Sequence, residues 1–173
     1  MTSFETDRLV VQDWHSFPPS FFQDIDLPGI VSQVMTKKVT AELPDHWRGD
    51  YPRQRAEQWI KERDHEGPTL MIVMRETQRA VGFMILHDLS EDQTGSQLRL
   101  GYMLAESCWG QGVGSEVIAG LTDWAKHNAV ESIVGGVTPA NLASQRVLLK
   151  NRFALADSSV DGTSELIFEW KAI

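Results

Sequence analysis

The chain has 173 residues, of which 42% are hydrophobic and 23% charged, and its formal net charge at pH 7 is −8. This size and composition predict one globular domain over residues 1–173, and the acidic balance argues against a nucleic-acid partner. There is no apolar run of membrane-spanning length, no signal-peptide pattern and one cysteine, Cys108, so we expect a cytoplasmic protein without membrane contact or internal disulfide.

The first third of the chain predicts one strand and one clear helix. Residues 8–14 are expected to form an edge or first strand. Residues 18–30 contain several prolines around Phe21 and Phe22, which predicts only a turn or two of helix. A helix is predicted from Tyr51-Pro52 through residue 63, because apolar side chains recur at helical spacing before Gly67-Pro68.

The middle of the chain predicts a hairpin and a third strand. Residues 69–75 and 79–86 are apolar runs joined by a short polar turn, which is typical of a β-hairpin. Residues 91–96 are polar and predict a loop, and residues 98–104 predict the next strand.

The last third alternates helices and strands. Residues 114–127 place apolar side chains on one face and predict an amphipathic helix. A strand over 132–138, a helix over 142–151 and a strand over 165–170 follow. Strands outnumber helices and hairpins are mixed with crossovers, so the sequence predicts a mixed sheet with helices on both faces.

The segment Trp109-Gly-Gln-Gly-Val-Gly114 lies between a predicted strand and a predicted helix. Glycines let backbone N–H groups approach a ligand, and a helix start adds free N–H donors and the positive end of its dipole. Such a loop suits a phosphate, although it lacks the lysine of a mononucleotide loop and the spacing of a dinucleotide loop. From the loop alone, a tight turn without a ligand is an equally good interpretation.

Four segments in chain order carry a family resemblance. They are Phe4-Glu-Thr-Asp-Arg-Leu-Val-Val11, Arg79-Ala-Val-Gly-Phe-Met-Ile-Leu86, the glycine loop preceded by Tyr102-Met-Leu104, and Asn141-Leu-Ala-Ser-Gln-Arg-Val-Leu-Leu-Lys150. Together they resemble the GNAT acetyltransferases, and within them the ribosomal-protein N-terminal acetyltransferases. The resemblance implies an α/β (α+β) single-domain fold, GNAT-like, with a mixed, mostly antiparallel sheet and helices on both faces.

The resemblance also implies acetyl-CoA as co-substrate and direct acetyl transfer to a primary amine in a ternary complex. The glycine loop is then expected to hold the CoA pyrophosphate, and the end of the preceding strand to hold the pantetheine arm and polarise the thioester carbonyl. The expected CoA-binding residues are Met103, Leu104, Trp109, Gly110, Gln111, Gly112, Val113, Gly114, Ser115 and Asn141.

Asn141 and Ser144 have two interpretations. The local pattern predicts that Asn141 caps a helix in which Ser144 is the third residue. The resemblance makes Asn141 a hydrogen-bond partner of the pantetheine and Ser144 the proton donor to the leaving thiolate, so both are the predicted catalytic residues. The chain's two tyrosines lie outside this segment, which favours Ser144 as the donor.

Some residues depart from the family pattern or have no expected role. Arg99 stands where the family's strand often has a glutamate, and Arg152-Phe153 where the family usually has Gly-Phe. Cys108 has no histidine at an activating spacing and is expected to be unreactive. The five histidines show no metal-binding spacing, so no metal is predicted, and Trp109 is expected to pack in the core or on the loop.

The acceptor amine is the least specified part of the reaction. An α-amine has a pKa near 8, so about a tenth of it is neutral at pH 7, whereas lysine needs stronger help from a base. The absence of a glutamate at Arg99 therefore favours a peptide or protein N-terminus. A small-molecule amine and a noncatalytic acyl-CoA-binding module stay open, as do a monomer and a homodimer.

Overall fold

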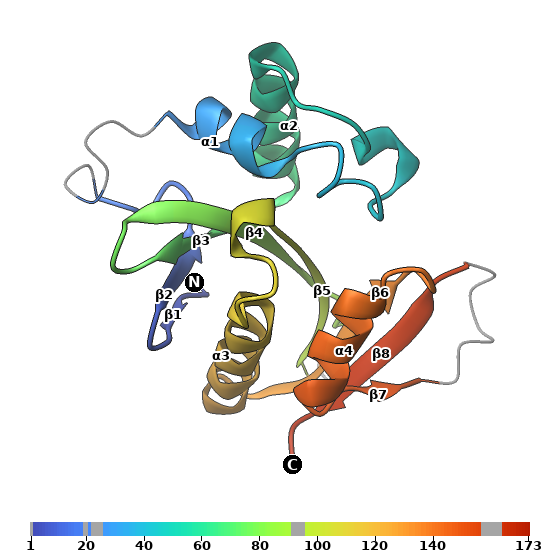
Figure 1. Cartoon of the computed structure of the whole chain (residues 1–173). Helices are drawn as coiled ribbons and strands as arrows, with labels where there is room; N and C mark the ends of the chain where they lie inside the picture. Colours follow the sequence, from blue (N-terminus) through green and yellow to red (C-terminus); the bar gives the residue numbers. More distant parts are fainter. Residues whose placement is uncertain (1, 19–20, 22–25, 91–95, 157–163) are drawn as a thin grey trace. The chain divides into compact units, whose positions relative to one another are not determined.

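The computed structural model describes residues 2–18, 21, 26–90, 96–156 and 164–173 (Figure 1). The described strands are β1 (Phe4–Glu5), β2 (Leu9–Asp13), β3 (Thr69–Met74), β4 (Arg79–Asp88), β5 (Ser96–Leu104), β6 (Val130–Val137), β7 (Ala154–Leu155) and β8 (Leu166–Lys171). The helices are α1 (Leu27–Val34), α2 (Arg53–Glu66), α3 (Val113–His127) and α4 (Leu142–Lys150), with short 3₁₀ helices η1 (Asp45–Trp47) and η2 (Glu106–Cys108).

The strands hydrogen-bond in the order β1-β2-β3-β4-β5-β6-β8-β7. β5 and β6 pair in parallel, from Ser96↔Val130 to Leu100↔Gly135. The pairs β1/β2, β2/β3, β3/β4, β6/β8 and β7/β8 are antiparallel. The predicted mixed and mostly antiparallel sheet is therefore confirmed.

The chain divides into two compact units. Unit 1 contains Met1–Ile85 and Tyr102–Gln111, and unit 2 contains Leu86–Gly101 and Gly112–Ile173. The chain passes from one unit to the other within β4, within β5 and inside the glycine loop.

Unit 1 is built on an aromatic core in which α1 and α2 pack on the strands (Figure 1). Trp14, Trp59 and Phe83 meet with ring centroids 5.7–5.9 Å apart, in edge-on or tilted arrangements that aromatic rings favour. Met71 and Val73 of β3 belong to this core. The intervening residues of β3 are buried as well, so this strand is covered on both faces.

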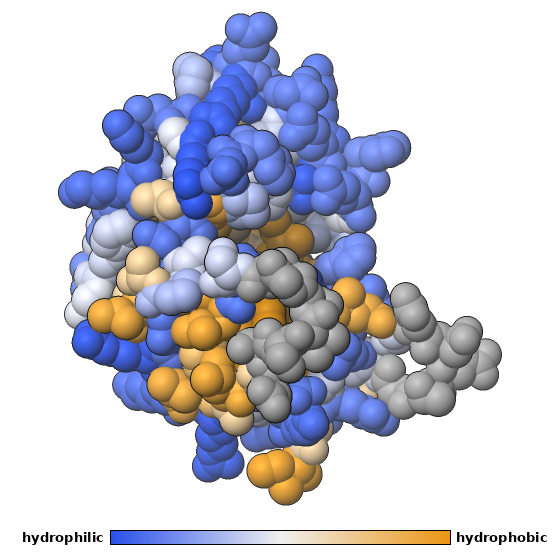
Figure 2. Space-filling model, turned by 90° about the vertical axis from the view of Figure 1, so that its right-hand side faces the viewer, coloured by the Kyte–Doolittle hydropathy of each residue, from blue (hydrophilic) through white to orange (hydrophobic). Residues whose placement is uncertain are grey.

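Unit 2 places α3 beside α4 and β6. The predicted amphipathic face of α3 is confirmed, since Val117, Ile118, Leu121 and Ala125 are buried. Figure 2 shows a face of the molecule on which apolar residues gather among hydrophilic ones. Among the described residues, the large apolar side chains that stay exposed are Trp109, Leu142, Leu149, Leu155 and Ile173.

Most predicted elements are found with ends shifted by three residues or fewer, but α1, β1 and β7 were missed. Pro28 suggested a helix breaker, yet it lies in the first turn of α1, where proline fits because its missing N–H has no helical partner anyway. Residues Phe4–Glu5 form a strand of their own before the predicted first strand, because the chain turns between Glu5 and Leu9 and β1 pairs with β2. Residues 19–20 and 22–25 of the segment predicted to hold a turn or two of helix, and residues 91–95 of the predicted loop over 91–96, lie outside the described residues.

Candidate functional site

The end of β5 is held tightly against β4 within unit 1. Ala105 N donates to the Val81 carbonyl at 2.7 Å. A Cβ at Gly82 would overlap the Met103 carbonyl oxygen, so Met103 directs that oxygen toward β4. Backbone polar groups of successive strand residues point to opposite edges, and the Leu104 N–H and C=O therefore face away from β4. Of the two residues, Leu104 is the stronger candidate for contact with a ligand.

The indole of Trp109 is fixed by the same strand end. Its Nε1 donates to the Leu104 carbonyl at 2.9 Å. The side chain is 49% exposed, so of the two expected environments, the core or the loop, Trp109 is not in the core. Gln111 turns its side-chain amide back to the Ser107 carbonyl at 2.8 Å, which ties the following turn of the loop to η2.

Gly112 begins α3 in the left-handed conformation, with φ 77° and ψ 5°. Side chains other than glycine's rarely adopt this conformation, so the sharp entry into the helix requires glycine here. The helix ladder begins with Glu116 N donating to Gly112 O. The N–H groups of Val113, Gly114 and Ser115 precede that bond, at the positive end of a helix of 15 residues. The side chain of Val113 is buried, so this residue can contact a ligand only through its backbone.

Asn141 caps α4, as the local pattern predicted. Its Oδ1 accepts from Ser144 N at 3.1 Å. The cap uses the backbone of Ser144, so removing the Ser144 hydroxyl leaves the cap intact. At the other end of α4, Asn151 Nδ2 donates to Ser115 Oγ at 3.3 Å and joins α4 to the first turn of α3.

Unit 2 also positions a carboxylate that the sequence did not reveal. Glu165 lies 3.6 Å from the Arg99 guanidinium, between Arg99 Nη2 and Glu165 Oε2. Its oxygen occupies the space that a Cβ of Gly136 would need, while the Cβ position of Gly135 points to Leu148 of α4. Glu165 and Arg99 therefore lie on the face of the sheet opposite α4. The Gly135-Gly136 pair within a predicted strand was the available signal, since strand glycines mark close approach of another group.

Cys108 is buried, and burial raises the pKa of its thiol. Its Sγ donates to the Ala105 carbonyl at 3.1 Å. A thiol that is protonated and enclosed is a poor nucleophile, in keeping with the expectation that Cys108 is unreactive.

The predicted residues fall in both units. Unit 1 holds those up to Gln111, and unit 2 holds those from Gly112 onward. Within unit 1 the structure joins Trp109 to Leu104, and within unit 2 it joins Asn141 to Ser144.

A family model described as an acetyltransferase (GNAT) domain matches residues 21–154. The chain belongs to the GNAT acetyltransferase family. This acetyltransferase is accordingly an acyltransferase that uses acetyl-CoA, and its acceptor is an amine. No curated protein sequence matches the chain.

Solved structures share the fold of this acetyltransferase over nearly its full length. A GNAT-family acetyltransferase from Bacillus anthracis is 13% identical, with a TM-score of 0.74 and 98% of each chain covered. RimL, a ribosomal L7/L12 alpha-N-protein acetyltransferase in complex with coenzyme A, is 15% identical, with a TM-score of 0.69 and 98% of each chain covered. The ribosomal-protein-S5-alanine acetyltransferase of Vibrio fischeri is 14% identical, with a TM-score of 0.61, and 99% of this chain and 97% of that one are covered. The expected GNAT-like fold is confirmed.

Two further findings concern the described part of the acetyltransferase. None of the described helices has the length and apolar character needed to cross a membrane. Within the same residues, no group of three or more histidine, cysteine, aspartate or glutamate side chains is placed to hold a metal ion.

Proposed function

We propose that this acetyltransferase moves the acetyl group of acetyl-CoA to the α-amine of a peptide or protein N-terminus, with residues 1–173 acting as one domain. The observation that carries the proposal is the Arg99–Glu165 pair, which puts a carboxylate beside Arg99, the residue that stands where the family's strand often has a glutamate. An α-amine with a pKa near 8 is partly neutral at pH 7 and needs only a nearby proton acceptor such as this carboxylate, whereas a lysine, with a pKa of about 10.4, needs stronger help. Alpha-N-acetylation by RimL, a protein of the same fold, supports the same acceptor class.

Binding of acetyl-CoA is assigned to the glycine loop and the end of β5. The backbone N–H groups of Val113, Gly114 and Ser115 would bind the pyrophosphate. The Leu104 N–H would donate to the acetyl carbonyl and stabilise the oxyanion that forms there. Asn141 would hold the pantetheine arm through the part of its amide that does not cap α4.

The chemistry is direct transfer without an acyl-enzyme. The neutral amine attacks the thioester carbonyl, the C–N bond forms, and the C–S bond breaks as the tetrahedral intermediate collapses. Ser144 is our candidate for giving a proton to the departing thiolate. Glu165 is our candidate for accepting the proton that the amine loses, through water.

Release of CoA thiol with an amine panel tests the proposal. The panel contains a peptide with a free N-terminus, an Nα-blocked peptide with one lysine, and a small primary amine. We expect thiol release with the first peptide to exceed release with the other two. Preference for the lysine or the small amine would overturn the acceptor assignment, and binding of CoA without release for any amine would indicate a noncatalytic module.

The role of Glu165 has its own test in the pH dependence. Glu165→Gln should lower kcat/KM strongly at pH 7 and less at pH 8.5, where the α-amine is mostly neutral without a base. Glu169→Gln is the matched control, because Glu169 lies on β8, the strand that begins directly after Glu165, but pairs with Lys171 at 3.2 Å. An equal loss at both pH values would assign Glu165 to structure alone.

A further inference from the structure

Arg8, close to the N-terminus of the sequence, contacts the glycine loop. Both Nη1 and Nη2 donate to the Gln111 carbonyl oxygen, each at 3.1 Å, across 103 residues. Gln111 is the residue directly before Gly112, the N-cap of α3. A guanidinium that directs two donors to one carbonyl fixes the direction of that carbonyl more firmly than a single neutral donor does.

The turn that carries Arg8 is itself firmly held. Thr6 N donates to Leu9 O at 3.0 Å, and Leu9 N donates to Thr6 Oγ1 at 3.1 Å. The Arg8 carbonyl accepts from Arg75 N at 2.8 Å, which extends the β2/β3 ladder to Arg8. The backbone from which the Arg8 side chain extends is therefore held in place by hydrogen bonds.

The geometry of the peptide group carries this constraint into the loop. The peptide between Gln111 and Gly112 is trans and planar, so its N–H points opposite to its C=O. With the Gln111 oxygen held toward Arg8, the Gly112 N–H must point away from Arg8. That N–H is the first of the run that continues through Val113, Gly114 and Ser115 into the first turn of α3.

We infer that Arg8 is a positioning residue for acetyl-CoA, acting through the Gln111 carbonyl to orient the N–H groups that bind the pyrophosphate. The inference rests on the proposed function, in which the glycine loop binds that group. Arg8 touches the loop on its carbonyl side, and no contact of its own with the substrate is assigned to it. Its loss should therefore weaken acetyl-CoA binding and leave the chemical step unchanged.

Two substrates distinguish positioning of the loop from a purely structural role. Acetyl-CoA contains the pyrophosphate, whereas S-acetylpantetheine carries the same thioester without it. Arg8→Met keeps the length of the side chain and removes the donors. We expect kcat/KM for acetyl-CoA to fall about tenfold, the low end for losing a charged hydrogen bond, with kcat at saturation and kcat/KM for S-acetylpantetheine unchanged.

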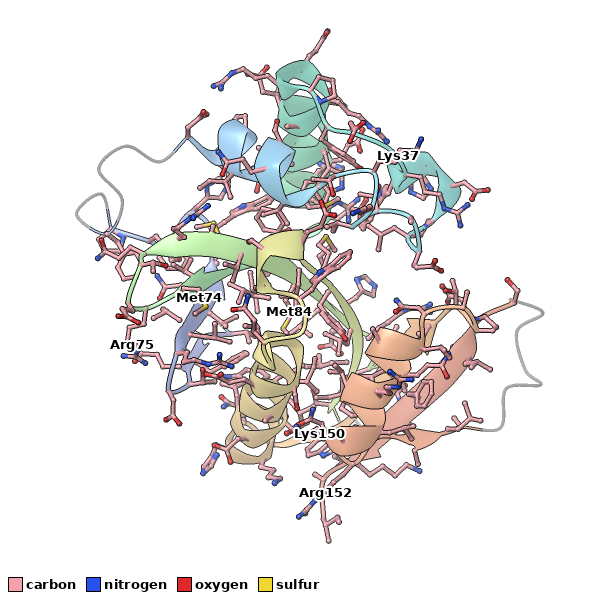
Figure 3. All side chains as sticks on the ribbon, in the orientation of Figure 1. Lys37, Met74, Arg75, Met84, Lys150 and Arg152 are labelled. Atoms are coloured by element: carbon pink, nitrogen blue, oxygen red, sulfur yellow. The ribbon has the colours of Figure 1, made fainter. Side chains whose placement is uncertain are left out.

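Arg75→Met is the matched control. Arg75 lies beside the same turn (Figure 3), where it pairs with Glu5 at 3.0 Å and donates to the Thr6 carbonyl at 2.8 Å. It should lose stability like Arg8→Met but keep its kcat/KM for acetyl-CoA. Arg8→Lys, with one donor group, should recover part of the loss.

A third variant separates this inference from the function beneath it. Gly114→Val adds a branched side chain to the first turn of α3 and should weaken CoA binding if the loop is the site. If Gly114→Val weakens CoA binding and Arg8→Met does not, the positioning role of Arg8 is overturned, whereas the assignment of the glycine loop to CoA binding is supported. If Gly114→Val binds CoA like the wild type, both assignments fall. Equal losses of kcat/KM for both substrates in Arg8→Met would reduce Arg8 to a structural residue.

Discussion

Gly82 lies directly against Met103, so closely that a Cβ at residue 82 would overlap the Met103 carbonyl oxygen and the Leu104 side chain. This contact presses the end of β5 onto β4 just before the glycine loop. It also explains why residue 82 is a glycine within a stretch, residues 80–86, whose other residues are all apolar. The direction of the Leu104 N–H, which we assign to the acetyl carbonyl, depends on this packing.

The first prediction concerns Gly82→Ala. The added methyl group has to displace backbone, so the variant should lose about 1–3 kcal/mol in the free energy of unfolding. Its kcat should fall too, because Leu104 shifts with the strand. Urea unfolding and steady-state kinetics measure both. Gly101→Ala is the control within β5, since a Cβ there meets nothing within 4 Å, and equal stability of the two variants would contradict the account.

The second prediction separates the cap of α4 from catalysis. Ser144→Ala should lower turnover by about tenfold or more, the low end for acid catalysis, with CoA affinity kept. The cap of α4 is kept as well, because Asn141 accepts from the Ser144 backbone N–H and not from its hydroxyl. Asn141→Ala should instead lose about 1 kcal/mol of stability, whereas Asn141→Ser keeps a capping oxygen and loses little.

Steady-state kinetics at saturating acceptor, with thermal unfolding of each variant, measure these effects. Wild-type turnover in Ser144→Ala would leave Ser144 as an ordinary residue of the first helical turn.

The third prediction concerns Arg152, at the end of α4 (Figure 3). Its φ is +66°. Phe153 N donates to Leu148 O and Arg152 N to Leu149 O, each at 3.1 Å, which is the Schellman pattern. That pattern favours glycine at the left-handed position, and the family's Gly-Phe fits it. Arg152→Gly should be more stable than Arg152→Ala by about 1 kcal/mol, because only glycine relieves the left-handed backbone. Equal unfolding midpoints for Arg152→Gly and Arg152→Ala would contradict the idea that the left-handed backbone at residue 152 is strained.

The fourth prediction concerns Cys108. Because burial raises the pKa of its thiol, the folded protein holds this proton to higher pH than the unfolded chain does. The thiol therefore contributes stability at neutral pH that is lost as the pH rises through about 8.5 and above. Labelling with a thiol reagent at pH 7.5 should be much slower in the native protein than in urea, and Cys108→Ala should keep full turnover. Loss of turnover in this variant would instead support an acyl-enzyme.

Local patterns predicted the parts of the site that are local in the chain. The glycine loop before α3 and the Asn141 cap of α4 each depend on neighbouring residues, and both were expected from spacing and residue type. The helix α1 was missed because Pro28 and Gly29 signal turns outside a helix start.

Contacts between distant residues could not be predicted in this way. Arg8 contacts Gln111, and Glu165 contacts Arg99, because the pairing of strands brings these distant segments together. A single sequence gives no register for strands that are far apart, so neither partner could be assigned.

The central claim is the class of acceptor, and mass spectrometry of one peptide tests it most directly. The peptide carries a free N-terminus and an internal lysine, and it is incubated with the acetyltransferase and acetyl-CoA between pH 6.5 and 9. We predict that the acetyl group is found on the N-terminus, at a rate that rises with pH between about 7 and 8.5 and then levels off as the α-amine becomes neutral. Acetylation mainly on the lysine would contradict the account.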